Sequence, residues 1–242
     1  LLKSSVAKVI SISLAKYLPE KYKNFTYSEK DEDFILNNGM IELEKKDHKY
    51  LSDIYNQIPS STSYFDLISD KKISSIANTL LDREKNSNLY IDNTTVKMDI
   101  PGITPWVYGW HTDKSGGIPQ SKFVQLWVPF VGSSEKNLGG LKIIKNSHTK
   151  KVGTDDDERV RQLALGGKYA RPKIDNKVIG ANIKTDEVEL FCEWGEGIFF
   201  QNTLMHKSGI NKTKDRMRYA FTCFYHDLYN PEWKFTVLKG KT

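Results

Sequence analysis

The stretch KFVQLWVPFV, residues 122–131, indicates the fold class of this chain. It is a short run rich in valine and aromatic residues, and comparable runs recur from about residue 89 onward. These runs are LYIDNTTVKMDI (89–100), WVYGWH (106–111), GGLKII (139–144), EVELFCEW (187–194), GIFFQNT (197–203) and RYAFTCFYHDL (218–228). Glycine, proline, asparagine and serine separate them, and many short strands at this spacing predict an antiparallel sandwich or barrel.

The first third of the chain follows a different period. In SSVAKVISISLAKYL (4–18) apolar residues recur at steps of three and four, as they do in residues 47–58 and 69–82. This spacing is typical of amphipathic helices that pack one face on a core. The sequence therefore predicts one domain over residues 1–242, with helical support over 1–86 and a β core over 87–230.

The segment between Lys150 and Lys184 interrupts the strand pattern, because it is highly charged and contains Gly166, Gly167 and Pro172. A long irregular insertion in a compact domain is typical of a lid or binding loop. A plain surface loop with one short helix is an equally good interpretation.

Composition excludes several classes of protein. The hydrophobic fraction of 38% with 12% aromatic residues is ample for a folded core. The net charge of +6 comes from scattered lysines, which favours a solvated surface over a face that binds nucleic acid. The apolar stretch VAKVISISLAKYL (6–18) is too short and too rich in lysine to span a bilayer.

The two cysteines, Cys192 and Cys223, both lie inside apolar runs. Two thiols cannot build a disulfide scaffold or a four-ligand zinc site. Buried, reduced thiols fit a cytoplasmic protein. We therefore expect a cytoplasmic protein that acts on a small molecule, without a nucleic-acid or membrane partner, and the oligomeric state is left open.

The segment YGWHTDKSGG (108–117) raises the question of a metal site. On an extended strand, His111 and Asp113 point to the same face, where an imidazole and a carboxylate can share a cation. His206 follows the apolar run GIFFQNTLM and is the best third ligand among the remaining histidines. Two histidines and one carboxylate form the facial triad of non-haem Fe(II) oxygenases. The competing interpretation is a polar strand end, because an isolated H-x-D motif occurs by chance.

Two arginines strengthen the metal interpretation. Arg216 and Arg218 follow His206 by 10 and 12 residues (216 − 206 and 218 − 206), at the head of the next predicted strand. An oxygenase that uses 2-oxoglutarate needs a cation for the distal carboxylate, and arginine pairs bidentately with carboxylates.

With these residues the sequence resembles the phytanoyl-CoA dioxygenase (PhyH-like) family of Fe(II)/2-oxoglutarate-dependent oxygenases, from about Val96 to Tyr225. Three blocks carry the resemblance: WHTD (110–113), LWVPFVGSSEKNLGGLKIIKNSH (126–148), and GEGIFFQNTLMHKSGINKT (195–213) with RYAFTCFY (218–225). The resemblance implies a double-stranded β-helix, a cupin-like jelly roll, buttressed by the N-terminal helices. It also implies Fe(II) as the metal, 2-oxoglutarate as co-substrate, and O2.

By this resemblance, His111, Asp113 and His206 ligate iron. Halogenating relatives replace the acid of H-x-D with a small residue, so the presence of Asp113 favours hydroxylation. The family's Pro-Gly before Ser-His is Lys145–Asn146 here, which changes a turn and touches no ligand.

The resemblance assigns the distal carboxylate of 2-oxoglutarate to Arg218, because RYAFT matches the family pattern better than RMRYA does. Arg216 remains the rival, since we expect it on the same strand face. Trp127 stands where the family has a tryptophan near the co-substrate, and Gln125, two residues earlier, is expected to contact the co-substrate as well. His226, at a strand end, is interpreted as making a structural hydrogen bond in preference to a substrate contact.

The predicted function is hydroxylation of a C–H bond in a small polar or anionic metabolite, with release of succinate and CO2. The anionic option rests on cations in the segments expected to frame the entrance: Lys114, Arg159, Arg161, Lys168 and Arg171. The alternatives are a cupin-like metal-binding module without turnover and a metal-dependent isomerase that does not turn over 2-oxoglutarate. A nucleic-acid oxygenase would require clustered basic residues with interleaved aromatics, which the sequence lacks.

Overall fold

The computed structural model describes residues 1–84, 87–102, 110–113, 122–132, 134–149 and 186–227. The α-helices are α1 (Leu2–Tyr17), α2 (Pro19–Tyr22), α3 (Glu32–Phe34), α4 (Met40–Lys46), α5 (His48–Gln57), α6 (Thr62–Ile68) and α7 (Lys71–Leu80). Shorter helical turns are η1 (Glu29–Asp31), η2 (Ile35–Gly39), η3 (Ile58–Ser60) and η4 (Ser147–Thr149). The strands are β1 (Tyr90–Asp99), β2 (Lys122–Pro129), β3 (Leu141–Ile144), β4 (Glu187–Leu190), β5 (Ile198–Gln201), β6 (His206–Ser208) and β7 (Arg218–Asp227).

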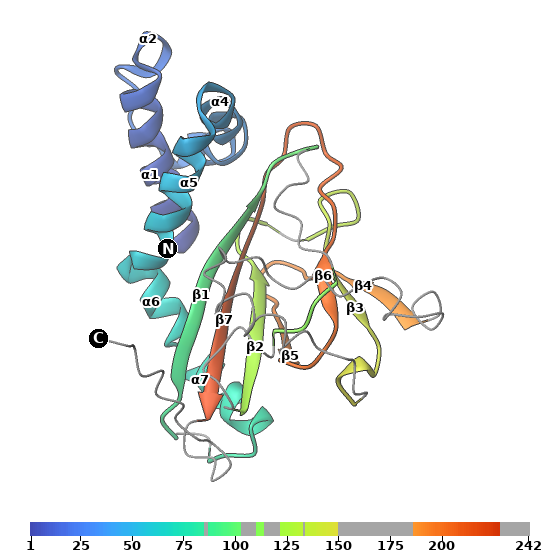
Figure 1. The fold of residues 1–242 in the computed structure, drawn as a ribbon. Coiled ribbons are helices and arrows are strands. Elements are labelled where there is room, and N and C mark those ends of the chain that lie inside the picture. Colours follow the sequence, from blue (N-terminus) through green and yellow to red (C-terminus); the bar gives the residue numbers. More distant parts are fainter. Residues whose placement is uncertain (85–86, 103–109, 114–121, 133, 150–185, 228–242) are drawn as a thin grey trace, which may run out of the picture.

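The strands form two sheets that face each other (Figure 1). One has the order β1-β7-β2-β5 and the other the order β4-β3-β6, and every pairing is antiparallel. The expected fold class, mainly β with N-terminal helices in a jelly roll, is confirmed. Most of the WVYGWH run and the whole of the 150–184 insertion lie outside the described residues.

The alternation along β2 and β7 decides which side chains meet the helices and which face the second sheet. Val124 and Leu126 belong to the large core cluster shared with the helices. Their neighbour Trp127 instead packs in a second cluster with Ala220 of β7 and Leu141 of β3. Because side chains alternate along a strand, every second residue of β2 and β7 faces the interior between the sheets. This interior is where functional side chains can converge.

Tyrosines fasten the helical third to the outer face of the larger sheet. The Tyr219 hydroxyl donates to the carbonyl of Leu36 at 2.6 Å, and the Tyr225 hydroxyl donates to the carbonyl of Ile68 at 2.7 Å. Burial raises the pKa values of the Tyr219 and Tyr225 hydroxyls well above that of an exposed tyrosine, so both hydroxyls stay protonated and donate. Figure 1 shows the helices along the β1 and β7 side of the molecule. The N-terminal helices therefore pack on this sheet, and their role as support for the β core remains a prediction.

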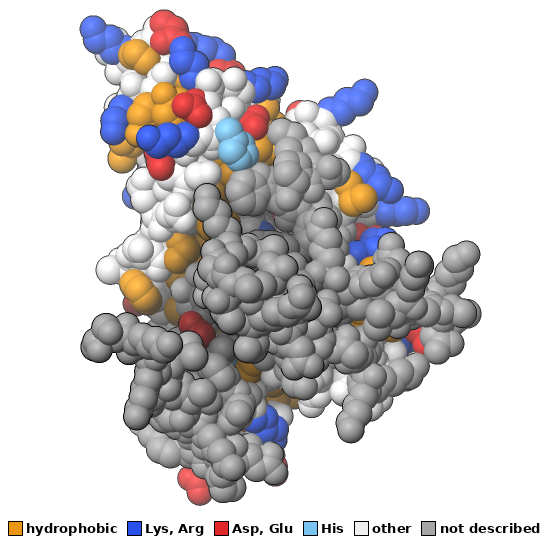
Figure 2. Space-filling model, in the orientation of Figure 1, with side chains coloured by type: hydrophobic (Ala, Val, Ile, Leu, Met, Phe, Trp, Pro, Cys, Tyr) orange, Lys and Arg blue, Asp and Glu red, His pale blue; other side chains and the backbone are white. Residues whose placement is uncertain are grey.

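The surface and the thiols agree with the expectations from composition. On the face shown in Figure 2, lysines and arginines over the helices are interspersed with acidic residues. Among the helices of the described ranges, none combines the length and the apolar character that a membrane span requires. Cys192 and Cys223 are buried and unpaired with each other, and burial raises their thiol pKa values to about 11 and about 12. The cytoplasmic location remains a prediction.

Candidate metal centre

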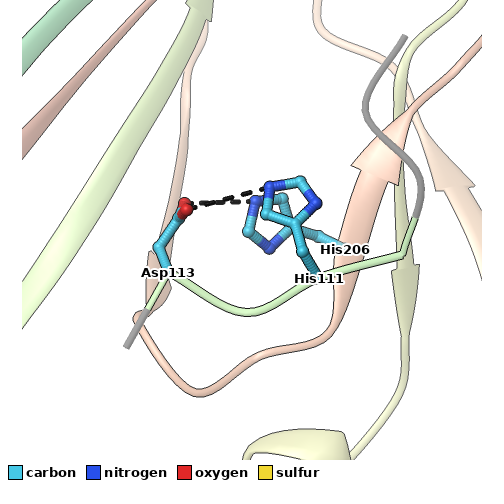
Figure 3. A group of neighbouring side chains, drawn as sticks. All are labelled: His111, Asp113 and His206. Atoms are coloured by element: carbon cyan, nitrogen blue, oxygen red, sulfur yellow. Dashed lines mark ion pairs between the residues drawn. The ribbon is translucent and has the colours of Figure 1, made fainter. Parts of the chain in front are cut away.

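A backbone bridge brings His111 and His206 together. The amide of each donates to the carbonyl of the other at 3.0 Å, in an isolated antiparallel bridge. Directly opposed residues of an antiparallel pair have side chains on the same face. The two imidazole rings accordingly lie 4.2 Å apart between centroids (Figure 3).

Asp113 completes the group from a turn. Its amide donates to the carbonyl of Asn202 at 3.0 Å, on the loop that leads into β6. Its carboxylate lies 3.3 Å from Nε2 of His206 and 3.8 Å from Nε2 of His111 (Figure 3). The sequence predicted an extended strand from His111 to Asp113, but only His111 makes a strand bridge, and the chain turns after it. The two side chains still converge as expected.

The chemistry of these donors fits a divalent cation. Nδ1 of His206 lies 3.0 Å from the carbonyl of Leu204, which only accepts, so this nitrogen carries the proton and Nε2 presents its lone pair. One ligand atom from each of His111, Asp113 and His206 lies within 4.8 Å of the others. Bonds of about 2.0–2.2 Å to one ion would bring cis ligand atoms about 3 Å apart, which requires only small movements.

Burial supports the same conclusion. His111, Asp113 and His206 are 7%, 3% and 4% exposed, and a buried carboxylate is costly without a cation or a full set of donors. Within the described part of the chain, this is the one group of three such side chains that could hold a metal ion. Two imidazoles and a carboxylate arranged in this way can bind Fe(II) and leave positions open for other ligands.

Phe200 and the turn at Ser147, neither of which the sequence marked as functional, pack around His206 and the residue before it. The Phe200 ring meets the His206 ring edge-on at 4.7 Å between centroids. The Ser147 hydroxyl accepts the amide of Met205 at 2.8 Å and donates to the carbonyl of Ile144 at 2.8 Å. The adjoining Asn146 has φ of 59°, a left-handed conformation that asparagine tolerates. The departure from Pro-Gly therefore changes a turn without touching a ligand, as predicted.

The structure separates the two candidate arginines. Arg218 opens β7 and is 2% exposed. Its Nε and Nη2 donate to Oδ2 of Asp99 at 2.8 and 2.6 Å, and its Nη1 donates to the carbonyls of Gly209 at 3.0 Å and Gly140 at 3.4 Å. The guanidinium is thus held rigidly at one end of the interior. The sequence contains one indication that Asp99 is a buried partner, namely that an acidic residue stands inside the predicted strand run TTVKMDI.

Arg216 lies before β7 and pairs with Glu135, and both side chains are about half exposed, at 48% and 51%. The expectation that Arg216 shares a strand face with Arg218 is wrong, because Arg216 belongs to the loop between β6 and β7. Asn211 fixes that loop by accepting from the amide of Thr213 at 3.0 Å.

Trp127 and Gln125 both lie on the inner face of β2, where the sequence placed them together. Trp127 is packed in the interior cluster, and Gln125 is 5% exposed, opposite Phe200 on β5 and Phe224 on β7. The entrance cations Lys114, Arg159, Arg161, Lys168 and Arg171 lie outside the described residues.

The phytanoyl-CoA dioxygenase (PhyH) family matches residues 19–220 of the chain, helices included. The chain belongs to this family. His111, Asp113 and His206, the group of described side chains that could hold a metal ion, lie within the matched residues. No curated protein matches the sequence significantly.

Solved structures share the fold at low sequence identity. EctD from S. alaskensis with bound Fe has 19% identity and a TM-score of 0.51, with 84% of this chain and 78% of that chain covered. The apo form of EctD from S. alaskensis has 22% identity and a TM-score of 0.50, with coverages of 71% and 55%. SnoN, a non-heme alpha-ketoglutarate-dependent epimerase from nogalamycin biosynthesis, has 18% identity and a TM-score of 0.51, with coverages of 69% and 59%. This chain thus spans less than two thirds of the length of some of these relatives.

Proposed function

We propose that this PhyH-family protein is a hydroxylase that uses Fe(II), 2-oxoglutarate and O2 to hydroxylate a C–H bond of a small polar metabolite, releasing succinate and CO2. The observation that carries the proposal is the convergence of a buried two-histidine, one-carboxylate group and a buried arginine on the interior of the same two-sheet barrel. This is the donor set that the reaction needs.

His111, Asp113 and His206 would hold the iron through Nε2 of each imidazole and one carboxylate oxygen. The bound ion would chelate the keto acid and activate oxygen, which is the chemistry that no side chain supplies. The presence of Asp113, rather than a small residue, supports hydroxylation over halogenation, because a carboxylate occupies the position that halide would need. Phe200, whose ring contacts the His206 ring, and Trp127, in the same interior cluster, would help to keep water from the reacting atoms.

Arg218 would bind the distal carboxylate of 2-oxoglutarate. A guanidinium has five N–H donors. In this structure two of the N–H groups of Arg218, one on Nε and one on Nη2, donate to Asp99. The two N–H groups of Nη1 donate to the carbonyls of Gly140 and Gly209. One N–H of Nη2 is left for a ligand carboxylate, and the long contact to Gly140 can yield a second. Trp127 would pack beside the carbon chain of the co-substrate.

A similar fold in SnoN makes epimerisation the second candidate, because that relative is described as an epimerase dependent on the same keto acid. The two reactions differ in product. Hydroxylation leaves one oxygen atom from O2 in the substrate, whereas epimerisation returns a substrate of unchanged composition. Mass spectrometry of product formed under 18O2 separates them once a substrate is in hand.

The first test is an anaerobic titration of the purified apoprotein with Fe(II) and then 2-oxoglutarate, followed by visible absorption. We expect the weak band of the iron–keto acid chelate, and we expect Asp113→Ala and His206→Ala to abolish it. Arg218→Lys keeps the positive charge but removes the fork, so it should weaken 2-oxoglutarate binding at least tenfold. Arg216→Lys is the matched control, and its titration should coincide with that of the wild type. Iron binding without the band would refute the proposal.

A further inference from the structure

The inner face of the larger sheet has two chemically different ends. At one end Arg218 lies opposite Asp99, and Lys97 lies opposite Ala220 in the next inward row. At the other end Phe224 lies opposite Gln125, and His226 lies opposite Phe123. Directly opposed residues share a face, so these four rows all point toward the second sheet. One end is cationic and the other is aromatic.

The metal centre lies between these ends. Gly209, whose carbonyl accepts from Arg218, is three residues after His206, about 10 Å along an extended chain. On the other side, the Phe200 ring contacts the His206 ring, and Phe200 is the cross-strand neighbour of Gln125. Gln125 is thus one side chain away from a metal ligand, on the side opposite Arg218.

Gln125 has an unusual environment for a buried amide. It is 5% exposed, and its Oε1 is fully buried with no hydrogen-bond partner. Buried side-chain amides that serve a structural role are nearly always hydrogen-bonded within the protein. An unsatisfied amide facing the interior is therefore available to a ligand.

The position of Gln125 favours a ligand other than the co-substrate held by Arg218 as the missing partner. Phe224, level with Gln125, is six residues from Arg218 along β7, about 20 Å at the usual rise per residue. The two carboxyl carbons of 2-oxoglutarate are only about 5 Å apart, at ordinary C–C bond lengths. The co-substrate contact expected for Gln125 from the sequence would need both side chains to extend along the strands to span this spacing. The substrate side of the metal is the better place for it.

The groups around Gln125 do not favour an anion. Phe123 and Phe224 stack with centroids 4.7 Å apart, and Phe123 also packs on His226 at 4.5 Å. His226 is fully buried, and burial lowers its pKa to about 4 against the opposing effect of Asp92, so it is neutral near pH 7. Asp92 is the β1 neighbour of Phe224 and adds negative charge at the edge.

No described cation offsets the negative charge of Asp92 in the two aromatic rows, which are the row of Phe123 and His226 and the row of Gln125 and Phe224. Lys122, the charged residue of β2 nearest to these rows, points to the opposite face and donates to the carbonyl of Leu81 at 3.2 Å. Lys97 and Arg218 belong to the other end of the interior. Among the described residues of the Phe123 and Gln125 rows, the inward side chains are aromatic, amide, neutral imidazole or acid.

We propose that Gln125 binds the substrate, and that the part of the substrate held there is uncharged, with an apolar body among Phe123, Phe200 and Phe224 and a hydroxyl or amide hydrogen-bonded to the Gln125 side chain. An amide offers a donor or an acceptor according to which way it is turned, which suits groups of this kind. This inference rests on the proposed function and narrows its substrate class to molecules with an uncharged, partly apolar portion that carries a hydroxyl or amide.

The first arm of the test measures thermal unfolding without ligands. Gln125→Leu removes the unsatisfied amide at similar size, so the melting temperature should stay the same or rise by about 2–4 °C. Gln201→Leu is the matched control, because Gln201 is an exposed residue of the adjacent strand β5. A fall of several degrees in Gln125→Leu alone would overturn the proposal, since it would mean that the amide has a structural partner.

The second arm measures binding of isosteric probes to protein loaded with Mn(II) and 2-oxoglutarate: acetamide against acetate, isobutyramide against isobutyrate, and phenylacetamide against phenylacetate. Paramagnetic relaxation of the probe protons reports their proximity to the metal. At least one amide should bind ten times more tightly than its carboxylate, and Gln125→Leu should abolish that preference while Gln201→Leu keeps it. Equal or tighter carboxylate binding, absence of any amide binding, or an unchanged preference in Gln125→Leu would overturn the proposal.

The iron–keto acid band separates this proposal from the function it rests on. Gln125→Leu should retain the band with the 2-oxoglutarate affinity of the wild type. If the variant loses that affinity, Gln125 contacts the co-substrate and the inference is wrong, while the proposed function stands. If the wild type itself shows no band, the proposed function is wrong.

Discussion

The ion pair between Asp99 and Arg218 should be among the largest local contributions to stability in this protein. The two side chains are 5% and 3% exposed, and two guanidinium nitrogens donate to one carboxylate oxygen at 2.8 and 2.6 Å. Removing one partner of a buried pair leaves an uncompensated charge and costs about 3–5 kcal/mol. Asp99→Ala keeps the hydrogen bonds from Arg218 to the carbonyls of Gly140 and Gly209, so we expect the lower end, about 3 kcal/mol. For a chain of this length that corresponds to about 6–12 °C in melting temperature.

Urea unfolding of the wild type, Asp99→Ala, Arg218→Met and the double variant would measure this effect. The double variant removes both charges and should be more stable than the sum of the single losses predicts, giving a coupling energy above about 2 kcal/mol. The exposed pair of Arg216 with Glu135 is the matched control: Glu135→Ala should cost less than about 1 kcal/mol, an effect that 1 M salt removes. A loss below about 1 kcal/mol in Asp99→Ala, or one that salt erases, would refute the reasoning.

Three further predictions concern the interior and its supports. Burial lowers the pKa of His226 to about 4 in the folded protein, against about 6.5 in the unfolded chain. Its contribution to the free energy of unfolding is therefore complete above pH 6.5 and is lost as pH falls through 4, because the unfolded chain binds the proton first. Over that window urea unfolding should show a loss of up to about 3 kcal/mol that His226→Gln reduces, and an identical pH profile in the variant would contradict the assignment. Gly139→Ala should destabilise the protein by more than about 2 kcal/mol and weaken 2-oxoglutarate binding, because φ is +85° and a Cβ would lie 2.8 Å from Nη1 of Arg218. Gly195→Ala, with φ of +88° and open space around it, should cost only about 1 kcal/mol and leave binding unchanged, so equal effects would argue against the contact. The thiols, with pKa values of about 11 and about 12, should resist aromatic disulfide reagents at pH 8 until urea unfolds the protein, and rapid labelling of the folded protein would show that they are accessible.

The sequence by itself indicated most of the described helices and strands and the three candidate metal ligands. Strands and helices have different side-chain periods, and those periods are local, so the change near residue 89 was legible without a structure. His111 and Asp113 are two residues apart, and their convergence needs only a short stretch of backbone. His206 could be added because it follows an apolar run and matches a family block. Each of these inferences uses residues that are close together in the sequence.

Only the tertiary structure distinguished the surroundings of Arg216 and Arg218. The two are chemically identical and two residues apart, and what separates them is where β7 begins and that Asp99, 119 residues away in sequence, lies opposite Arg218. The neighbours of Gln125, which are Phe200 on β5 and Phe224 on β7, are likewise set by strand register. Cross-strand register depends on residues far apart in the chain, so a local pattern that assigns a residue to the inner face does not say which partner it meets there.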